Sequence, residues 1–346
     1  MNKENRLTKR MENIMASDNN VKLYPNFPNK NLLIEVTNMC NNICIFCGNR
    51  KMCRKKGFIK DEVVESALKQ AFELGMREVG FYSTGEPLLN KNIFNYIKLA
   101  KSIGYSYTYI TTNGLLLDED VFKKLVESGL DSIKLSINAI DRKKYFFIHG
   151  VDKYDVVLSN LKKICKIKQT KNLKIKIFVS YIATKYTDEE KKKILDKFSC
   201  CDEVVIVNVR NQSGMVPEVN KYLKCSKECG KIESQRPLPC FYPFKSINVT
   251  YEGYLTACCS DFENALVYGD LSKETMKDSW QNIYITSLRK KHLNNELNGT
   301  LCNNCIYNCE STPVPIRKDI NFKIADINDD TEVKNRIKKY LKEGMK

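Results

Sequence analysis

Three cysteines lie close together in the stretch CNNICIFC, residues 40–47, which places Cys40, Cys44 and Cys47 in the spacing C-x3-C-x2-C. Three thiolates are one short of the four that close a tetrahedral zinc site or saturate a [4Fe–4S] cube. An iron left open in this way can bind a small molecule through its amine and carboxylate and pass it an electron. The alternatives are a zinc knuckle and three reduced, buried thiols.

The position of these cysteines in the chain favours a functional site. They follow the apolar run Leu32-Leu33-Ile34-Glu35-Val36, which is typical of a buried strand. The sequence therefore places them on a loop at the carboxyl end of a strand, where α/β barrels build their active sites.

The first two thirds of the chain alternate between strand-like and helix-like segments. Strands joined by helical crossovers predict a parallel sheet, and six such units are too few for a closed eight-stranded barrel. The expected fold is therefore α/β, an open (β/α)6 partial TIM barrel. The expected strands are 31–37, 77–83, 106–112, 131–138, 173–182 and 203–210, and the expected helices are 61–74, 92–103, 118–128, 153–168 and 187–198.

The pattern changes after Arg210, where the chain becomes mixed and polar and contains three prolines before residue 240. This change predicts a linker followed by a small cysteine-rich domain. We expect five parts: a polar N-terminal extension (1–30), the partial barrel (31–215), the linker (216–239), the cysteine-rich domain (240–310) and a basic tail (311–346) with a short surface helix over 332–343.

The composition bears on the cellular compartment of the chain and on the partners that we expect it to bind. The 346 residues include 15 cysteines, and residues 1–20 lack the apolar segment of a secretory signal. Cysteines in a cytoplasmic chain are more often metal ligands than disulfides. No apolar stretch is long enough to span a bilayer, so we expect no membrane partner. The net charge of +16 is carried by scattered lysines, which disfavours nucleic acid as a partner.

The cysteine triplet, with Phe46 directly before its last cysteine, resembles that of the radical S-adenosylmethionine (radical SAM) superfamily. The resemblance implies a [4Fe–4S] cluster whose open iron holds SAM. In that family the cluster cleaves SAM to a 5′-deoxyadenosyl radical. An external one-electron reductant such as flavodoxin or ferredoxin is implied as a partner.

The resemblance also suggests which residues bind SAM. Gly85-Glu86-Pro87 follows the second expected strand and is similar to the family's Gly-Gly-Glu-Pro motif, with Thr84 in place of the first glycine. In the family this motif binds the amino group of SAM, and polar side chains at the next strand ends bind its ribose and carboxylate, while Phe46 would pack near the adenine. The expected set is Phe46, Gly85, Glu86, Asn113, Ser136, Asn138 and Ser180.

One pair departs from the family's pattern. Where many relatives have Arg-Gly after the fourth strand, this chain has His149-Gly150. An imidazole near the substrate is one interpretation. We expect His149 to be a surface residue instead.

A second cysteine set lies in the cysteine-rich region. Cys240, Gly253 and Cys258 have the spacing C-x12-G-x4-C, which predicts a β-hairpin that turns at Gly253, and Cys302 and Cys305 add C-x2-C. The set resembles the SPASM/twitch extension, and the shorter twitch form implies one auxiliary [4Fe–4S] cluster. A zinc ribbon is the alternative.

The other cysteines receive weaker assignments. Cys259 could replace its neighbour Cys258 as a ligand, and Cys309 follows too soon after Cys305 to fit a second auxiliary cluster. The isolated pair formed by Cys225 and Cys229 is expected to be unligated, although cluster ligation stays open. Cys53, Cys165, Cys200 and Cys201 are interpreted as bystanders.

These resemblances imply an oxidation. A fully ligated auxiliary cluster can accept an electron from a substrate radical, which suits conversion of an alcohol to a ketone on a sugar or cyclitol, as in the twitch dehydrogenase that acts on 2-deoxy-scyllo-inosamine. Such a reaction needs a general base, and Asp261 is the hypothesis for it.

Two alternatives stay open: a peptide- or protein-modifying radical SAM maturase, and a zinc-stabilised basic module that binds nucleic acid. Only about 30 residues precede the first strand, which leaves no room for a peptide-binding domain there. A small molecule is therefore the expected substrate.

Overall fold

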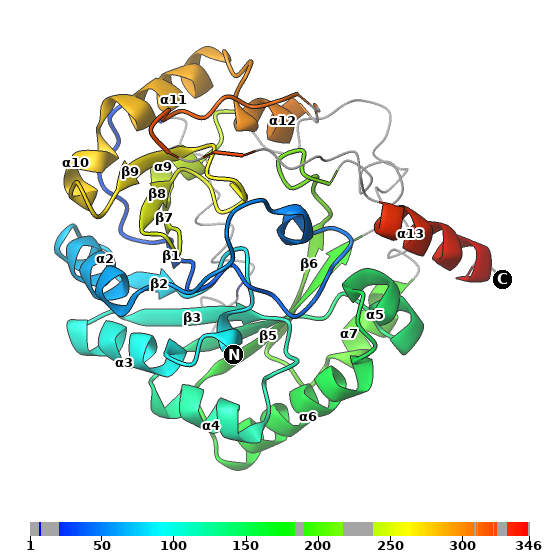
Figure 1. Cartoon of the computed structure of the whole chain (residues 1–346). Helices are drawn as coiled ribbons and strands as arrows, with labels where there is room; N and C mark the ends of the chain where they lie inside the picture. Colours follow the sequence, from blue (N-terminus) through cyan, green and yellow to red (C-terminus); the bar gives the residue numbers. More distant parts are fainter. Residues whose placement is uncertain are drawn as a thin grey trace.

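The computed structural model of the chain describes residues 7, 21–183, 190–216, 238–307, 309, 311–320, 322–323 and 331–344. The described strands form one nine-stranded sheet, in which the strand order is β6-β5-β4-β3-β2-β1-β7-β8-β9 (Figure 1). Within this described part of the chain, no helix combines the length and the apolar character needed to cross a membrane.

The first six strands are parallel and form the predicted open barrel. β6 has no pairing with β1, so the parallel sheet does not close on itself, and the predicted fold class is confirmed. The strands are β1 (Leu32–Ile34), β2 (Glu78–Gly80), β3 (Tyr107–Thr112), β4 (Ser132–Ser136), β5 (Lys176–Ala183) and β6 (Glu203–Asn208).

Helices cover the outer face of this sheet (Figure 1). Those expected from sequence are α2 (Asp61–Glu73), α3 (Ile93–Ile103), α4 (Glu119–Glu127), α6 (Tyr154–Thr170), α7 (Lys191–Lys197) and, near the C-terminus, α13 (Thr331–Gly344). Asp118 caps α4 by accepting a hydrogen bond from the backbone N–H of Val121. Gly75, at φ 104°, follows the end of α2 in the left-handed conformation that favours glycine.

One helix of the barrel was not predicted. α5 (Arg142–His149) begins with three consecutive basic residues and shows no apolar period, so its sequence resembles a loop. Its start is fixed by Asp141, whose carboxylate accepts a hydrogen bond from the backbone N–H of Lys144. Its end is fixed by Gly150 at φ 73°.

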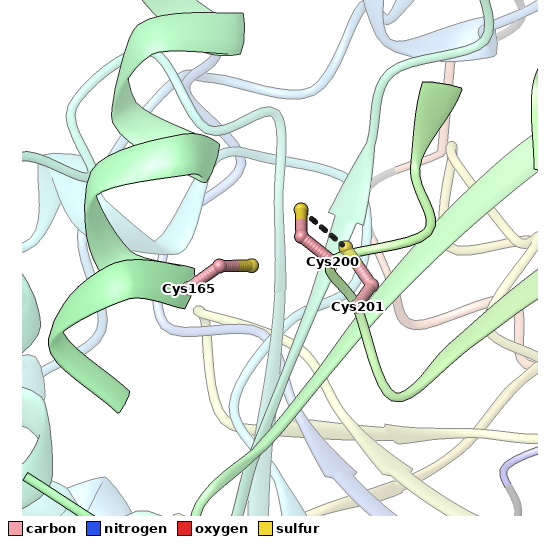
Figure 2. Close-up of side chains that lie close together, drawn as sticks. All are labelled: Cys165, Cys200 and Cys201. Atoms are coloured by element: carbon pink, nitrogen blue, oxygen red, sulfur yellow. Dashed lines mark hydrogen bonds between the residues drawn. The ribbon is translucent and has the colours of Figure 1, made fainter. Parts of the chain in front are cut away.

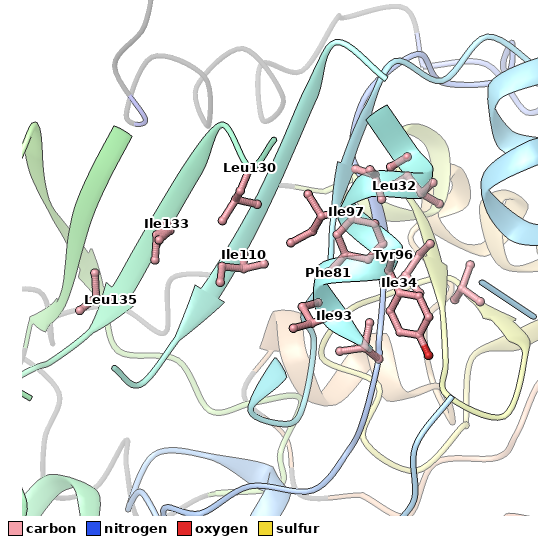
Figure 3. Packing of buried hydrophobic residues seen from close by; sticks show 14 of the residues in the cluster. Leu32, Ile34, Phe81, Ile93, Tyr96, Ile97, Ile110, Leu130, Ile133 and Leu135 are labelled. Carbon is pink, nitrogen blue, oxygen red and sulfur yellow. The ribbon is translucent and has the colours of Figure 1, made fainter. Parts of the chain in front are cut away.

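The two faces of the parallel sheet make different contacts. Side chains that point outward pack against the helices, as Ile34, Phe81 and Ile110 do in Figure 3. Side chains of the opposite parity point into the barrel lumen, because successive residues of a strand face opposite sides. The apolar outer face holds the barrel together, and the lumen is left for polar side chains.

The cysteine-rich region extends the same sheet. β7 (Ile247–Val249) pairs in parallel with β1, and the antiparallel strands β8 (Tyr254–Thr256) and β9 (Val267–Asp270) follow. Gly253, at φ 91°, lies in the β7–β8 turn, as the cysteine spacing predicted. The remaining segments are η2 (Gly48–Lys51), η3 (Pro87–Leu89), α9 (Tyr242–Lys245), α10 (Met276–Trp280), α11 (Ile283–Asn294) and α12 (Leu301–Tyr307).

A buried arginine joins the barrel to this extension. The Arg54 guanidinium lies 2.6 Å from a carboxylate oxygen of Glu35, which follows β1, and 2.5 Å from one of Glu252, in the β7–β8 turn. The other carboxylate oxygen of Glu35 accepts a hydrogen bond from the Thr84 hydroxyl, after β2. The Arg54 side chain is only 4% exposed, so this network fixes three segments with little help from solvent.

Replacing this arginine by an uncharged side chain of similar length should therefore be costly. We expect Arg54→Met to lower the free energy of unfolding by about 3–5 kcal/mol, because the buried carboxylate of Glu35 and the partly buried one of Glu252 lose their cation. Urea denaturation measures the change. Lys69→Met is the matched control, since the Lys69–Glu65 pair is exposed and should contribute less than about 1 kcal/mol. Equal effects of the two substitutions would contradict this role of Arg54.

Candidate active site

The loop that carries the cysteine triplet is held against the end of β2 by a close backbone contact. A Cβ atom at Gly85 would lie 2.5 Å from the carbonyl oxygen of Met39 and would also collide with that of Thr37. The backbone N–H of Glu86 donates to the same Met39 carbonyl over 2.8 Å. Only glycine therefore allows the approach that places Cys40 beside the second strand.

The other half of the loop is held by α5. The backbone N–H groups of Ile43 and Ile45 donate to the carbonyls of His149 and Ile148, at 3.1 and 2.9 Å. From α13, the Arg336 guanidinium donates to the carbonyl of Ile43 over 3.0 Å. The backbone around Cys44 is thus fixed by two helices that are far apart in sequence.

The three cysteines of the triplet are partly buried, and their thiols influence one another. Burial raises the pKa of Cys40 to about 12 and raises the pKa values of Cys44 and Cys47, and the neighbouring thiols add to the effect at Cys40 and Cys44. Three thiolates in this position need a strongly positive partner, which a bound metal centre provides. A set of soft sulfur donors suits iron–sulfur or zinc chemistry.

The spacing of the sulfur atoms favours a cluster over a single ion. Four sulfurs around one zinc ion at about 2.3 Å lie about 3.8 Å apart. Among the residues that the structure describes, the only group with three or more ligand atoms all within 4.8 Å of one another is Cys165, Cys200 and Cys201. At least one pair of sulfurs in the triplet is therefore more than 4.8 Å apart, which is wider than one zinc ion requires.

The prediction that His149 is a surface residue is wrong. The residue is buried, its Nδ1 lies 3.2 Å from Sγ of Cys44, and its Nε2 lies 2.6 Å from the carbonyl oxygen of Ile137. Its ring stacks on Tyr145 with 4.3 Å between the ring centroids. The apolar residues Phe147 and Ile148 directly before it were the available signal that this helix end is buried.

Glu86 is placed as a brace between strands. Its carboxylate accepts hydrogen bonds from the Thr112 hydroxyl and the Asn113 backbone N–H, both at 2.7 Å, and from the backbone N–H of Leu88 at 3.1 Å. Burial raises its pKa to about 7. These contacts join the ends of β2 and β3, and binding of the SAM ammonium by this carboxylate stays a prediction.

The other polar residues of the expected SAM site lie at successive strand ends. The Asn113 side-chain amide donates to the side chain of Asn41, in the cysteine loop, over 2.6 Å. The hydroxyls of Ser136 and Ser180 lie 3.3 Å apart in the β4–β5 register. Asn138, at φ 56°, accepts a hydrogen bond from the backbone N–H of Ile182 and so continues the β4–β5 pairing. Their predicted contacts with SAM are untested.

Phe46 lies in a small apolar cluster beside the triplet. The cluster also contains Phe147 and Ile148 of α5, and Val209 after β6. Only 7% of the Phe46 surface is exposed, so the ring forms a wall of the site. Packing against the adenine stays a prediction.

A cavity of about 720 Å³, its open mouth included, occupies the barrel lumen. Polar and apolar side chains of the strands and strand ends face it, and the cysteine-rich region closes one side. Its lining consists of Leu7, Asn31, Leu33, Tyr82, Tyr109, Ile110, Thr111, Ser132, Lys134, Phe178, Phe241, Tyr242 and Cys259.

Lys134 brings a charge into this lumen. Burial lowers the pKa of its ammonium, and nearby Cys259 acts in the opposite direction. Its Nζ lies 5.7 Å from the ring centroid of Tyr82. A desolvated lysine of this kind can take up a proton or hold an anionic group of a ligand.

The four cysteines of the second set line one small cavity. Cys240, Cys258, Cys302 and Cys305 surround about 320 Å³ of space, together with apolar side chains. The chain brings them together from α12, the β8 end and the segment before α9. Four thiols that line one space fit a fully ligated centre, and no three of these sulfurs all lie within 4.8 Å of one another.

His292 adds a polar group to this cavity. It lies on α11, lines the cavity and is buried, and neither of its ring nitrogens has a hydrogen-bond partner. Burial lowers its pKa to about 4, so it is neutral and carries one N–H. Leaving such a donor unpaired is costly, and the sulfur atoms of a bound cluster would satisfy it.

Asp261 is placed away from both cavities just described. Its carboxylate accepts hydrogen bonds from the Thr256 hydroxyl at 2.6 Å and from the backbone N–H groups of Ala265 and Leu266, both at 2.8 Å. These contacts fix the connection between β8 and β9. The predicted role of Asp261 as a catalytic base stays a prediction.

The two cavities share a thin wall. Tyr242 lines both of them, and the adjacent residues Cys258 and Cys259 face the auxiliary cavity and the lumen respectively. A ligand in the lumen could therefore contact Cys259, the residue directly after Cys258 of the second cysteine set. Cys225 and Cys229 lie outside the described residues.

Comparison with known proteins places two domains on the chain. Residues 34–198 match the radical SAM superfamily, and residues 240–306 match the SPASM domain, an iron-sulfur cluster-binding domain. Similar curated relatives are probable GTP 3',8-cyclases. That of Pyrococcus horikoshii is 33% identical over 140 residues, 40% of this chain and 44% of the relative. That of Sulfurisphaera tokodaii is 31% identical over 137 residues, 40% of this chain and 43% of the relative, so less than half of each relative is matched.

Solved structures share the fold at low identity. BtrN in complex with AdoMet and 2-DOIA is 20% identical, with a TM-score of 0.53 over 83% of this chain and 96% of that one. Streptococcus suis SuiB bound to the precursor peptide SuiA is 17% identical, with a TM-score of 0.61 over 76% and 67%. anSMEcpe with bound AdoMet is 17% identical, with a TM-score of 0.57 over 91% and 94%.

The contact proposed for His292 predicts a shift in redox potential. In His292→Phe we expect the auxiliary centre to keep its iron but to have a lower reduction potential, because one N–H donor to sulfur is lost. A hydrogen bond of about 1 kcal/mol corresponds to a shift on the order of 40 mV for one electron. Spectroelectrochemical titration of the reconstituted protein measures it. An unchanged potential at full iron content would contradict the contact.

Proposed function

We propose that this chain, which contains a radical SAM domain and a SPASM domain, is an oxidoreductase that converts an alcohol of a sugar or cyclitol to a ketone. When bound, SAM and its cluster supply a radical that removes one hydrogen atom from the carbinol carbon, and the auxiliary cluster accepts the electron that remains. The observation that carries the proposal is the thin wall between the lumen and the cavity of the four cysteines.

This wall suits the oxidation because the substrate must lose an electron after it loses a hydrogen atom. Cys259 faces the lumen, and Cys258, the next residue along the backbone, faces the auxiliary cavity. The aromatic ring of Tyr242 lies between the same two spaces. A substrate held in the lumen would thus be close to an electron acceptor.

The lumen lining is mostly apolar, but it offers several hydroxyls to a polyhydroxylated substrate. The side chains of Tyr82, Tyr109, Thr111 and Ser132 each carry a hydroxyl that can donate or accept a hydrogen bond. A cyclitol or sugar offers matching hydroxyls around its ring. The BtrN complex contains 2-DOIA, which fits this class, although its similarity to this chain concerns the fold.

Lys134, which lines the lumen, is our candidate for the base in place of Asp261. Oxidation of an alcohol releases the hydroxyl proton as well as the hydrogen atom on carbon, and a neutral amine in the lumen can accept it. The lowered pKa of Lys134 increases the neutral fraction at physiological pH. The proton passes from the substrate hydroxyl to Nζ.

The electron for SAM cleavage must come from outside the chain. We propose a one-electron carrier such as flavodoxin or ferredoxin as the partner. The net charge of +16 supports a negatively charged carrier, because opposite charges speed association.

The proposal is tested with deuterated substrates. Anaerobically reconstituted enzyme is reduced in the presence of SAM and cyclitols or sugars that carry deuterium at one carbinol carbon. We expect deuterium in the 5′-deoxyadenosine and a ketone in equimolar amount, both detected by mass spectrometry.

GTP and short peptides serve as comparison substrates in the same assay. Turnover of GTP to a cyclised product would support the activity named for the curated relatives, and turnover of a peptide would support a maturase. Either result, with no cyclitol or sugar oxidised, would contradict the proposed function.

The role of Lys134 predicts a particular pH dependence. Product formation should rise with pH as the amine loses its proton, with a midpoint below the usual lysine pKa of 10.5. Lys134→Met should reduce ketone formation by about 10²–10⁴-fold, and 5′-deoxyadenosine should still form. Lys98→Met, at an exposed position of α3, is the control. Full ketone formation by Lys134→Met would exclude this base.

A further inference from the structure

A third group of cysteines lies on the opposite edge of the barrel from the candidate active site. Cys165 is near the C-terminal end of α6, and Cys200 and Cys201 lie in the turn between α7 and β6 (Figure 2). Since α6 runs antiparallel to the strands and the turn leads into β6, the three meet at the amino ends of the strands. The sequence alone gave no reason to group them, because 35 residues separate Cys165 from the pair.

The geometry of this group differs from that of both cluster sites. The three Sγ atoms all lie within 4.8 Å of one another, and those of Cys200 and Cys201 are 4.0 Å apart. Three sulfurs bound to one zinc ion at about 2.3 Å lie about 3.8 Å apart in a tetrahedron and about 4.0 Å apart in a plane. The group therefore needs to contract by less than an ångström to hold one ion.

The turn that carries Cys200 and Cys201 is held in place by the residue that follows them. The carboxylate of Asp202 contacts Lys168 of α6 at 2.5 Å and accepts a hydrogen bond from the backbone N–H of Ile177 at 2.8 Å. The three sulfurs are thus fixed on two elements that an ion pair joins.

Access and burial are divided between the three thiols. Cys165 is buried, Cys201 is partly buried and Cys200 is exposed. An ion can therefore reach the group from solvent through Cys200 and be anchored by Cys165. Binding of the ion would release the thiol protons to solvent and would change no oxidation state, so it needs no oxidant.

We propose that Cys165, Cys200 and Cys201 form a three-thiolate site for one soft d10 metal ion, with Zn²⁺ as the cellular ion, separate from both iron–sulfur sites. Soft sulfur ligands select such ions over Mg²⁺ or Ca²⁺. Water would take the fourth position, as in other zinc sites with three protein ligands. The ion would tie α6 to the turn before β6 at the amino edge of the sheet, a place where barrels are stabilised and do no chemistry.

The test uses the full-length enzyme with both iron–sulfur sites reconstituted anaerobically, then incubated with zinc chloride and desalted. We expect about one tightly bound zinc per chain, and zinc X-ray absorption should show three sulfur neighbours at about 2.3 Å with one lighter atom. In C165S/C200S/C201S the zinc should be lost and the iron content unchanged. Zinc should also raise the unfolding temperature of the wild-type protein and not that of this variant.

A second measurement does not depend on folding of the triple variant. Zinc should slow alkylation of Cys200 by N-ethylmaleimide in the wild-type protein at least tenfold, and a chelator should restore it. Alkylation of Cys53, which is exposed and far from the group in sequence, is the internal control and should not change.

Four results would overturn the proposal. Zinc retained in full by the triple variant would place the ion elsewhere. Iron lost from that variant would make the group part of an iron–sulfur site. A disulfide between two of the three thiols in anaerobically purified protein, or unchanged alkylation of Cys200 with zinc, would show that the group does not hold a metal ion.

Discussion

The buried contact of Arg54 with Glu35 and Glu252 is the interaction on which the arrangement of the two cysteine sets depends. Glu35 ends the first strand, five residues before Cys40, and Glu252 lies in the turn six residues before Cys258. One guanidinium therefore fixes both loops relative to each other. Because the group is almost inaccessible to water, its charge cannot be replaced by solvation, and the geometry is held firmly.

The two cysteine sets differ in their surroundings, and therefore in what they can bind. The triplet offers three thiols at the mouth of the barrel, beside polar side chains at the strand ends, and so leaves room for a ligand. The second set encloses its own cavity with four thiols and His292. Tyr242 lines both this cavity and the lumen, so the fold places the second cysteine set next to the lumen.

The sequence was sufficient to predict the barrel and the two cysteine sets, because both are encoded locally. Strands and helices follow from apolar period, and the triplet and the C-x2-C pair follow from spacing. The pairing of β7 with β1 joins segments more than 200 residues apart, and no local pattern encodes it. α5 was missed because its first turn is basic and only its last residues are apolar.

Individual side-chain roles were harder to predict than the sites. Asp261 and Glu86 have the residue type expected of a base and of an ammonium partner, but hydrogen bonds from nearby backbone groups hold both as braces. No sequence pattern marks His149 or His292 as a site residue. The structure shows that His149 contacts Cys44 and that His292 lines the cavity of the second cysteine set. The sequence does not distinguish Lys134 from the other lysines, and only the structure shows that it faces the lumen.

The central claim is that the chain holds one open and one closed iron–sulfur centre in two independent cysteine sets. Electron paramagnetic resonance of the reduced protein, combined with iron counts, tests it most directly. We predict about eight irons per wild-type chain and about four in C40S/C44S/C47S. Adding SAM should change the wild-type spectrum and leave that of the variant unchanged. Loss of all iron from the variant, zinc in place of iron, or a wild-type spectrum that ignores SAM would contradict the account.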